Sequence, residues 1–396
     1  MKPLLAVFGV VACGAAIATL VSCGGGSSSG SSGGSNNTSA PVQSSFAVTA
    51  LVSDGAVAAA HTDANLKNPW GVAFNPNGFV WVADNGSNVA TLYDGNGVPQ
   101  SLVVTIPAGK NGPASPTGIV FNGTQSFTVT ANGKSGAAAF IFAGEGGTIT
   151  AWAPAVEPTN AFVMYDDGTG GAVYKGLALA TMNNANFLYA TDFHNNKIDV
   201  FNSAFSKVAM PGAFTDPVIP AGFAPFGIQA IGSNLFVTYA MQDAAKHDDV
   251  AGAGLGMVDV YDTAGNLKQR FATGSPLNAP WGIAQAPANF GSMSGAILIG
   301  NFGDGTVNAF NASSGQSMGP LVASNGSVIV EPGVWGIAFG NGLESQPSNT
   351  LFFAAGPNNE ANGVYGRIDL NATPSAGTAT GSGTGTSTGA GTSMGM

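Results

Sequence analysis

The sequence contains little charge and almost no cysteine. Only 8% of its 396 residues are charged, and 11 basic against 21 acidic residues give a net charge of −10. This shortage of positive charge argues against nucleic-acid binding and against adhesion to anionic lipid through a basic surface. The low charge, combined with 59 glycines, also argues against long exposed helices and favours tight turns and closely packed sheets.

The two cysteines both lie near the N-terminus, at Cys13 and Cys23. Met1 and Lys2 begin an apolar, small-residue run to Leu20, a pattern typical of an export signal. The run ends in "LVSC", which resembles the lipobox of bacterial lipoproteins. That resemblance implies cleavage before Cys23 and acylation of this residue, and several acyl chains anchor a protein durably. An ordinary secretory peptide that happens to contain a cysteine is the alternative.

The composition along the chain predicts four segments. They are a signal peptide (1–22), a Gly/Ser-rich tether (23–45), a folded part (46–370) and a disordered Gly/Thr/Ser tail (371–396). Loss of Cys13 with the signal peptide leaves no internal disulfide, so stability must come from packing. By resemblance to enterobacterial sorting, Gly24 after the cysteine implies the outer membrane. We therefore expect an exported cell-envelope lipoprotein, bound to the membrane through Cys23 and facing the periplasm or the surface.

One apolar phrase recurs along the folded part. "PWGVAF" at 69–74 returns in six copies, whose glycines lie between 47 residues (Gly71 to Gly118) and 58 residues (Gly118 to Gly176) apart. The repeat glycines are Gly71, Gly118, Gly176, Gly227, Gly282 and Gly336. Each copy is followed by two further apolar runs, such as "FVWVAD" and "VATLYD", and then by a looser fourth run, such as 101–106 or 327–332.

Four short strands per repeat predict an all-β, six-bladed β-propeller with four antiparallel strands in each blade. A β-sandwich gives no reason for six-fold regularity, and solenoid repeats are usually shorter. The phrase suits the innermost strand, because a glycine fits where the backbones of neighbouring blades approach each other. The sixth repeat supplies only three strands before the tail. We therefore expect residues 46–54 to join the last blade and close the ring.

The repeats resemble NHL-type propellers, whose unit runs roughly P-x-G-I-A, then V-Y-V-A-D, then a third strand ending in F-D. Phrases such as "LVSDGAVAAAHTDANLKNPWG", "FTDPVIPAGFAPFG" and "FFAAGPNNEANGVYGRI" together resemble one family of exported bacterial NHL-like proteins. This resemblance extends over essentially all of residues 46–370. It supports the fold and the export, but it implies no particular activity.

The residue before each repeat glycine is a candidate for ligand binding. In an up-and-down blade, the loop entering the first strand shares a face with the turn between the second and third strands. Four aromatics, one hydroxyl and one cation would then surround the central mouth: Trp70, Thr117, Lys175, Phe226, Trp281 and Trp335. Such a ring could stack a sugar, a quinone-like ring or a partner's apolar side chain. Aromatic residues also close propeller channels for structural reasons alone, which is the alternative.

Oxygen-rich turns on the same face suggest a hard cation such as calcium. The candidate ligands are Asp84, Asp192, His194, Asp248, Asp304 and Glu360. Asn, Asp and Gly also dominate ordinary β-turns, so turn formation alone is the alternative for each. The loop "QDAAKHDDVAGAG", which contains His247, is a stronger candidate because no tight turn needs its length. Zinc is disfavoured, because three histidines would have to converge and His61 lies outside these turns.

Two functions fit these observations, beside a third interpretation as a passive surface-layer component. The favoured one is a lipid-anchored extracytoplasmic module that binds a protein or small-molecule ligand through the aromatic-ringed face. The alternative is a metal-dependent, calcium-type hydrolase or lyase with its site over the central channel. The motif "GSSSG" at 26–30 lacks the strand and helix of a nucleophile elbow, and "GAGLG" at 252–256 precedes a strand instead of following one. Enzymatic activity is therefore the less favoured interpretation.

Overall fold

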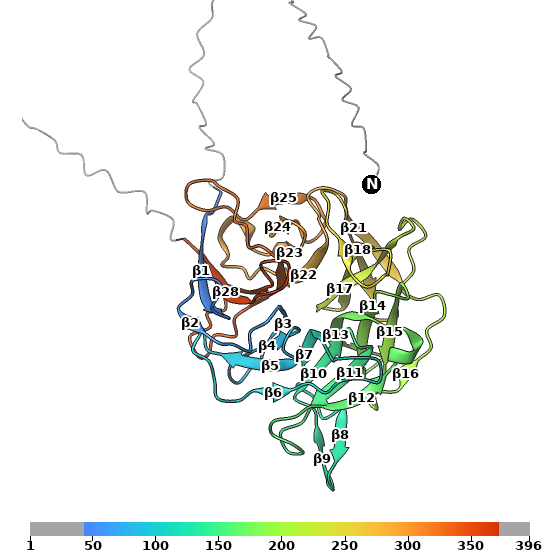
Figure 1. Ribbon diagram of the computed structural model, residues 1–396. Helices are drawn as coiled ribbons and strands as arrows, with labels where there is room; N and C mark the ends of the chain where they lie inside the picture. The colour runs from blue at the N-terminus through green and yellow to red at the C-terminus, as the bar shows by residue number, and fades with distance from the viewer. Residues whose placement is uncertain (1–42, 372–396) are drawn as a thin grey trace, which may run out of the picture. The chain divides into compact units, whose positions relative to one another are not determined.

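The computed structural model describes residues 43–371, which form a six-bladed β-propeller (Figure 1). This arrangement confirms the fold predicted from the six repeats. Cys23, the segment 1–22 and the tail from residue 372 lie outside the described residues, so the export signal and the lipid anchor stay predictions. Within the described range, no helix has the length and apolarity needed to cross a membrane.

Each blade is a small antiparallel sheet whose first strand lies nearest the axis. Blade one contains β3 (Pro69–Phe74), β4 (Val80–Asp84), β5 (Val89–Tyr93) and β6 (Val104–Thr105). Blade two contains β7 (Pro116–Phe121), β10 (Phe140–Gly144), β11 (Thr148–Trp152) and β12 (Phe162–Asp166). Blade three contains β13 (Tyr174–Met182), β14 (Ala185–Asp192), β15 (Lys197–Phe201) and β16 (Lys207–Val208).

The second half of the ring repeats this order. Blade four contains β17 (Phe223–Ile231), β18 (Asn234–Gln242), β20 (Met257–Asp262) and β21 (Leu267–Thr273). Blade five contains β22 (Pro280–Gln285), β23 (Ile297–Asn301), β24 (Val307–Phe310) and β25 (Ser317–Pro320). Blade six contains β26 (Val334–Phe339), β27 (Leu351–Ala355), β28 (Val364–Leu370) and β1 (Phe46–Ser53).

Short additional elements decorate the blades. β2 (His61–Thr62) pairs with β1, and β19 (Asp249–Val250) pairs with β18. The hairpin of β8 (Thr128–Ala131) and β9 (Lys134–Ala137) is inserted between β7 and β10 and projects from blade two (Figure 1). Two 3₁₀ turns, η1 (Gly168–Gly170) and η2 (Gly291–Met293), complete the elements.

The N-terminal strand closes the ring, as the sequence predicts. β1 pairs antiparallel with β28, from Phe46 opposite Leu370 to Ser53 opposite Val364. Figure 1 shows the two strands, at opposite ends of the colour scale, side by side. Blade six is therefore built from both ends of the folded part.

One predicted outer strand is wrong. Residues 327–332 form no strand, and the fourth strand of blade five is β25, an earlier segment. Val328 and Val330 in the predicted segment are 44% and 50% exposed, so they lie in the connection to blade six instead of in a packed sheet.

The repeat glycines sit where neighbouring first strands touch. A Cβ atom on Gly227 would collide with the carbonyl oxygen of Trp281 in the next blade, and one on Gly336 would collide with that of Trp70. Gly71, Gly176 and Gly282 meet the next blade's backbone in the same way. The contact therefore passes from blade six back to blade one and requires a residue without a side chain at each step.

Candidate functional site at the central channel

The backbone pairing between the first and second strands is interrupted at each repeat glycine and at the residue before it. All six ladders between first and second strands shift register there, for example between Pro69 and Val72 in blade one and between Val334 and Ile337 in blade six. An irregularity of this kind changes the direction in which a side chain leaves the strand. Here the pre-glycine side chains gather at the axis, on the face that carries the turns between second and third strands. We call this the turn face.

The six pre-glycine residues form a compact plug. Each is at least nine-tenths buried, from Thr117 and Phe226 at 0% exposed to Trp281 at 8%. Trp70 stacks on Trp335 with ring centroids 3.5 Å apart, and Trp281 meets Trp70 edge-on at 5.6 Å. These side chains contact one another across the axis, so they fill this end of the channel. Their predicted role in ligand binding stays a prediction, and the plug offers a ligand no open mouth from the turn face.

Hydrogen bonds fix two of the three indoles of the plug, while the buried Trp70 Nε1 has no partner among the described residues. Trp335 Nε1 donates to Asn68 Oδ1 at 3.0 Å, and Trp281 Nε1 donates to the Lys175 carbonyl at 3.0 Å. Thr117 Oγ1 donates to the Tyr174 carbonyl at 2.8 Å. The plug is thus held by polar contacts as well as by apolar packing.

A polar cap lies over the plug on the turn face. The buried Lys175 Nζ is bonded to Glu145 and lies 3.3 Å from Asp248 Oδ1 and 5.0 Å from the centroid of the Trp70 ring. Burial alone would lower the pKa of Lys175, but the neighbouring carboxylates outweigh it and raise that pKa. His247 Nδ1 lies 2.8 Å from Asp248 Oδ1; this contact lowers the pKa of Asp248 to about 2 and raises that of His247.

The cap contains the one group of potential metal ligands found among residues 43–371. Ligand atoms of Glu145, His247 and Asp248 lie within 4.8 Å of one another. The donor set suits a hard cation. However, the ammonium of Lys175 already contacts both carboxylates, so a divalent ion would have to share their oxygens with a buried positive charge. The cap therefore fits an internal ion pair better than a metal centre.

The other candidate metal ligands are dispersed among separate turns. The buried Asp84 accepts from Thr91 Oγ1 at 2.8 Å, and the buried Asp192 accepts from the Val173 amide at 3.2 Å. Glu360 accepts from Asn68 Nδ2 at 2.7 Å, and burial raises its pKa. Asp304 bonds Thr306 and Asn278, while His194 is half-buried in the turn after β14. Of the six, only Asp248 lies in the convergent group.

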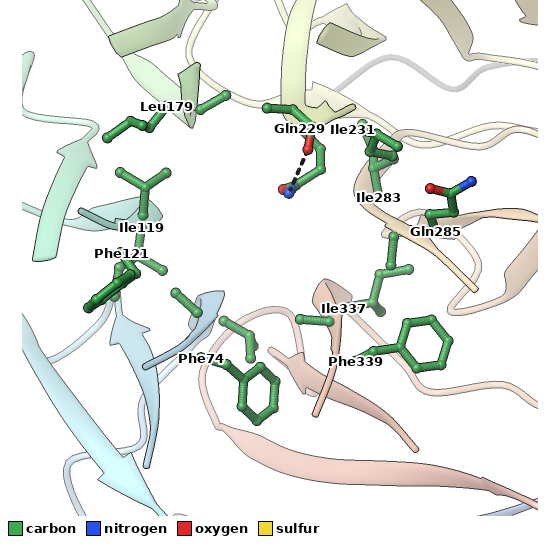
Figure 2. A pocket seen from close by; sticks show the side chains of 17 residues that line it. Phe74, Ile119, Phe121, Leu179, Gln229, Ile231, Ile283, Gln285, Ile337 and Phe339 are labelled. Atoms are coloured by element: carbon green, nitrogen blue, oxygen red, sulfur yellow. Dashed lines mark hydrogen bonds between the residues drawn. The ribbon is translucent and has the colours of Figure 1, made fainter. Parts of the chain in front are cut away.

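The channel is open on the opposite face, which we call the funnel face. A cavity of ≈ 400 Å³ extends along the axis there, and Figure 2 shows side chains from every first strand around it. Its lining, called the funnel, comprises residues 72–74, 119–121, 178–179, 229–231, 283–285 and 337–339. A narrower space of ≈ 40 Å³ continues between the repeat glycines as far as Trp281. The plug therefore forms the floor of the funnel.

The side chains of the funnel are mostly apolar and none is charged, although backbone polar groups are also exposed to the cavity. Its larger side chains include Phe74, Phe121 and Phe339, and Gln229 and Gln285 are the polar members of its lining. Sequence analysis assigned ligand binding to the residue before each glycine. The signal for the funnel was present in the one to four residues after each glycine, but an apolar run of this kind is also what a packed inner strand requires.

Comparisons with known proteins identify relatives that match this chain over most of their own length. The NHL repeat model matches residues 66–88, which span β3 and β4 of blade one. The uncharacterized protein R648 of Acanthamoeba polyphaga mimivirus is 32% identical over 334 residues, 82% of this chain and 80% of its own. Uncharacterized protein L690 of the same virus is 31% identical over 332 residues, 82% of this chain and 86% of its own. A solved protein of unknown function from Bacteroides thetaiotaomicron superposes with a TM-score of 0.51 at 12% identity, over 83% of this chain and 77% of that one, and shows a similar fold alone.

Proposed function

This chain belongs to the same family as the mimivirus proteins R648 and L690, and from that premise we propose that it is a binding propeller that holds an apolar ligand in its funnel. The named relatives carry no activity that could be transferred. The proposal is therefore supported by the site itself, whose uncharged cavity receives side chains from all six blades.

The size and lining of the funnel favour a small apolar molecule. Its ≈ 400 Å³ lies within the range of about 300–1,000 Å³ that is common for ligand pockets. A ligand there would meet aliphatic and aromatic side chains, with the Gln229 amide, which points into the cavity in Figure 2, available to orient a polar end. An acyl chain with a small uncharged head group has this distribution of polarity.

The described part of the chain begins beside the same cavity. Ser44 and Ser292 exchange hydrogen bonds of 2.9 and 2.8 Å on the funnel face. Phe46 packs on Phe290 at 4.8 Å, and Phe290 packs on Phe339 of the funnel wall at 5.0 Å. If Cys23 is acylated as the sequence suggests, the anchored segment would join the propeller on its funnel face. A lipid-like ligand would suit that attachment.

The first test measures binding of an uncharged fluorescent acyl probe, a labelled fatty alcohol, to the purified chain. A ligand at about 100 times its dissociation constant stabilises a protein by about 2.7 kcal/mol, so the same probe should raise the unfolding temperature. Leu179→Glu places a carboxylate in the funnel and should abolish the shift. Met318→Glu, at a 39% exposed position in β25, serves as the matched control and should preserve it. Equal binding by both variants would exclude the funnel.

The anchor needs a separate test. Cells that express the chain should incorporate labelled palmitate into it, and Cys23→Ser should abolish both the label and the membrane association. Retention of the label in that variant would contradict acylation at Cys23 without bearing on the funnel.

The metal-dependent hydrolase receives weaker support. The observation that favours a hydrolase is the group of Glu145, His247 and Asp248. Against it, the Lys175 ammonium occupies the place that a metal cation would take. Elemental analysis of the purified chain tests it: a stoichiometric divalent metal would favour the enzyme over the binding module.

A further inference from the structure

A stack of three aromatic rings leads from the plug to the surface of the turn face. Trp70 stacks on Trp335 at 3.5 Å and 16°, and Trp335 stacks on Phe302 at 3.9 Å and 15°. Trp70 and Trp335 are at most 2% exposed, whereas Phe302 is half-buried. Phe302, in the turn after β23, is therefore the outermost layer of a preorganised stack.

Phe302 lines a groove between blades five and six. This groove has a volume of ≈ 440 Å³ and is distinct from the funnel, because its walls are turns of the turn face. They are residues 302–305 after β23, Val330, Pro332 and Gly333 before β26, residues 356–359 after β27, and Ala251 of the long loop of blade four. Four of these residues are glycines, which leave the aromatic floor uncovered.

The turns that form the groove are fixed to one another. Gly356 N donates to the Gly333 carbonyl at 2.9 Å, and Glu331 N donates to the Gly305 carbonyl at 2.8 Å. Gly303 N donates to the Asn278 carbonyl at 3.1 Å. These bonds join the walls from both blades, so the groove exists before any ligand arrives.

The rim of the groove is polar and carries no positive charge. Asp304 and the exposed Asn358 and Asn359 stand along it, and its lining includes no Lys, Arg or His. Asp304 already accepts from Thr306 at 2.7 Å and from Asn278 at 3.2 Å. Among the described residues, the Asn359 side chain has no hydrogen-bond partner, so its amide is available to a ligand.

We propose that this groove binds the ring of a neutral sugar, with one face of a pyranose against Phe302 and its hydroxyls on the Asn359 amide, the Asn358 side-chain oxygen and the Asp304 carboxylate. The Asn358 side-chain nitrogen already donates to Asn362 Oδ1 at 2.9 Å. A pyranose presents an apolar C–H face and a polar edge, and the groove offers an aromatic floor and an amide-rich rim in the same arrangement. Phosphorylated or acidic sugars are disfavoured because the lining supplies a carboxylate and no cation to them. The proposal is independent of the funnel and of the lipid anchor.

Saturation-transfer NMR on the full chain tests the site. The probes are glucose, mannose, galactose, N-acetylglucosamine and their oligosaccharides, with galacturonic acid as the charged comparison. A neutral member should bind with a dissociation constant of about 1 mM or lower and receive most saturation at its C–H face. Phe302→Leu keeps an apolar side chain but removes the aromatic face, and it should weaken binding at least about tenfold.

Asn359→Ala provides a second variant in case Phe302→Leu unfolds the blade. Asn359 is exposed, and its side chain has no hydrogen-bond partner among the described residues. It should weaken binding several-fold while the protein stays folded, although an alanine at this positive φ of 53° lowers the unfolding temperature slightly. The matched control is Asn96→Ala, in an exposed turn of blade one, which should bind like the unmodified chain. Absence of binding by every neutral probe, tighter binding of galacturonic acid, or full binding by Asn359→Ala would each overturn the proposal.

Discussion

Lys175 is the charged member of the six pre-glycine residues, and its position is costly without a counter-ion. Its side chain is 1% exposed, and that of Glu145 is 13% exposed. Two such charges leave water together only if they remain paired. The ammonium also lies over the Trp70 ring, so the cap and the plug stabilise each other.

Lys175→Met should therefore lower the free energy of unfolding by about 3 kcal/mol, because it leaves Glu145 without its partner. The exposed Asp248 adds little to this loss, since water can solvate it. The variant also frees the carboxylates beside His247, so calcium should raise the unfolding temperature of Lys175→Met and leave that of the parent unchanged. Lys134→Met, in the exposed hairpin, is the control. Equal stabilisation of the parent by calcium would contradict the ion-pair interpretation and favour a metal centre.

Asp249 gives the cap a pH dependence. Burial raises its pKa to about 7, with Glu360 and Asp248 adding to the effect and Lys175 opposing it. A carboxyl whose folded pKa is raised holds its proton more tightly in the folded state, so its ionisation destabilises the fold as pH rises from about 4 to about 7. Asp249→Asn should unfold at a higher temperature than the parent at about pH 8, and the difference should disappear toward about pH 4. A difference that does not change with pH would show that Asp249 is not responsible.

At the level of elements, the sequence predicted inner strands better than outer ones. First, second and third strands pack on both faces, so they appear as continuous apolar runs such as "VWVAD", which is β4 and is buried throughout. Fourth strands are half-exposed: β25 reads "SMGP" and β6 has two residues, and neither carries such a signal. In an up-and-down blade, the loop entering the first strand shares a face with the turn between the second and third strands. This expectation correctly placed the pre-glycine residues on the turn face, as the hydrogen bond from Asn85 N to the Asn68 carbonyl at 3.2 Å illustrates.

The candidate site was predicted less completely, for a physical reason. Sequence spacing shows that Trp70 and Trp335 reach the axis, but it does not show whether large rings will surround a space or fill it. Their close stacking fills it. The same limit applies to Lys175, whose contact with Glu145 depends on turn geometry that no local pattern records.

The pairing of β1 with β28 can be tested by cross-linking. Ala47 lies opposite Asp369, and opposed residues in antiparallel strands have Cα atoms about 4.5–5.5 Å apart, within reach of a disulfide. Ala47→Cys with Asp369→Cys, in a chain with Cys13 and Cys23 replaced by Ser, should oxidise readily. The disulfide should stabilise the protein by about 2–4 kcal/mol relative to its reduced form. The pair Ala47→Cys and Arg367→Cys is two residues out of register and should stay reduced; cross-linking of that pair instead would show a shifted strand.

At the scale of the whole molecule, stability depends on an unbroken circle of close backbone contacts. Gly336→Ala would force a methyl group against the Trp70 carbonyl and within 3.1 Å of the Val72 amide, where blade six meets blade one. Relief of this overlap requires the two blades to separate, and overpacking of this kind costs about 1–3 kcal/mol. Gly78→Ala, whose methyl group would have its nearest neighbour at an ordinary 3.5 Å, should change stability by less than about 0.5 kcal/mol. Denaturant titration measures both. Because the first strands of blades six and one both line the funnel, Gly336→Ala should also weaken binding of the apolar ligand. Equal behaviour of the two variants would contradict this role of the backbone contacts.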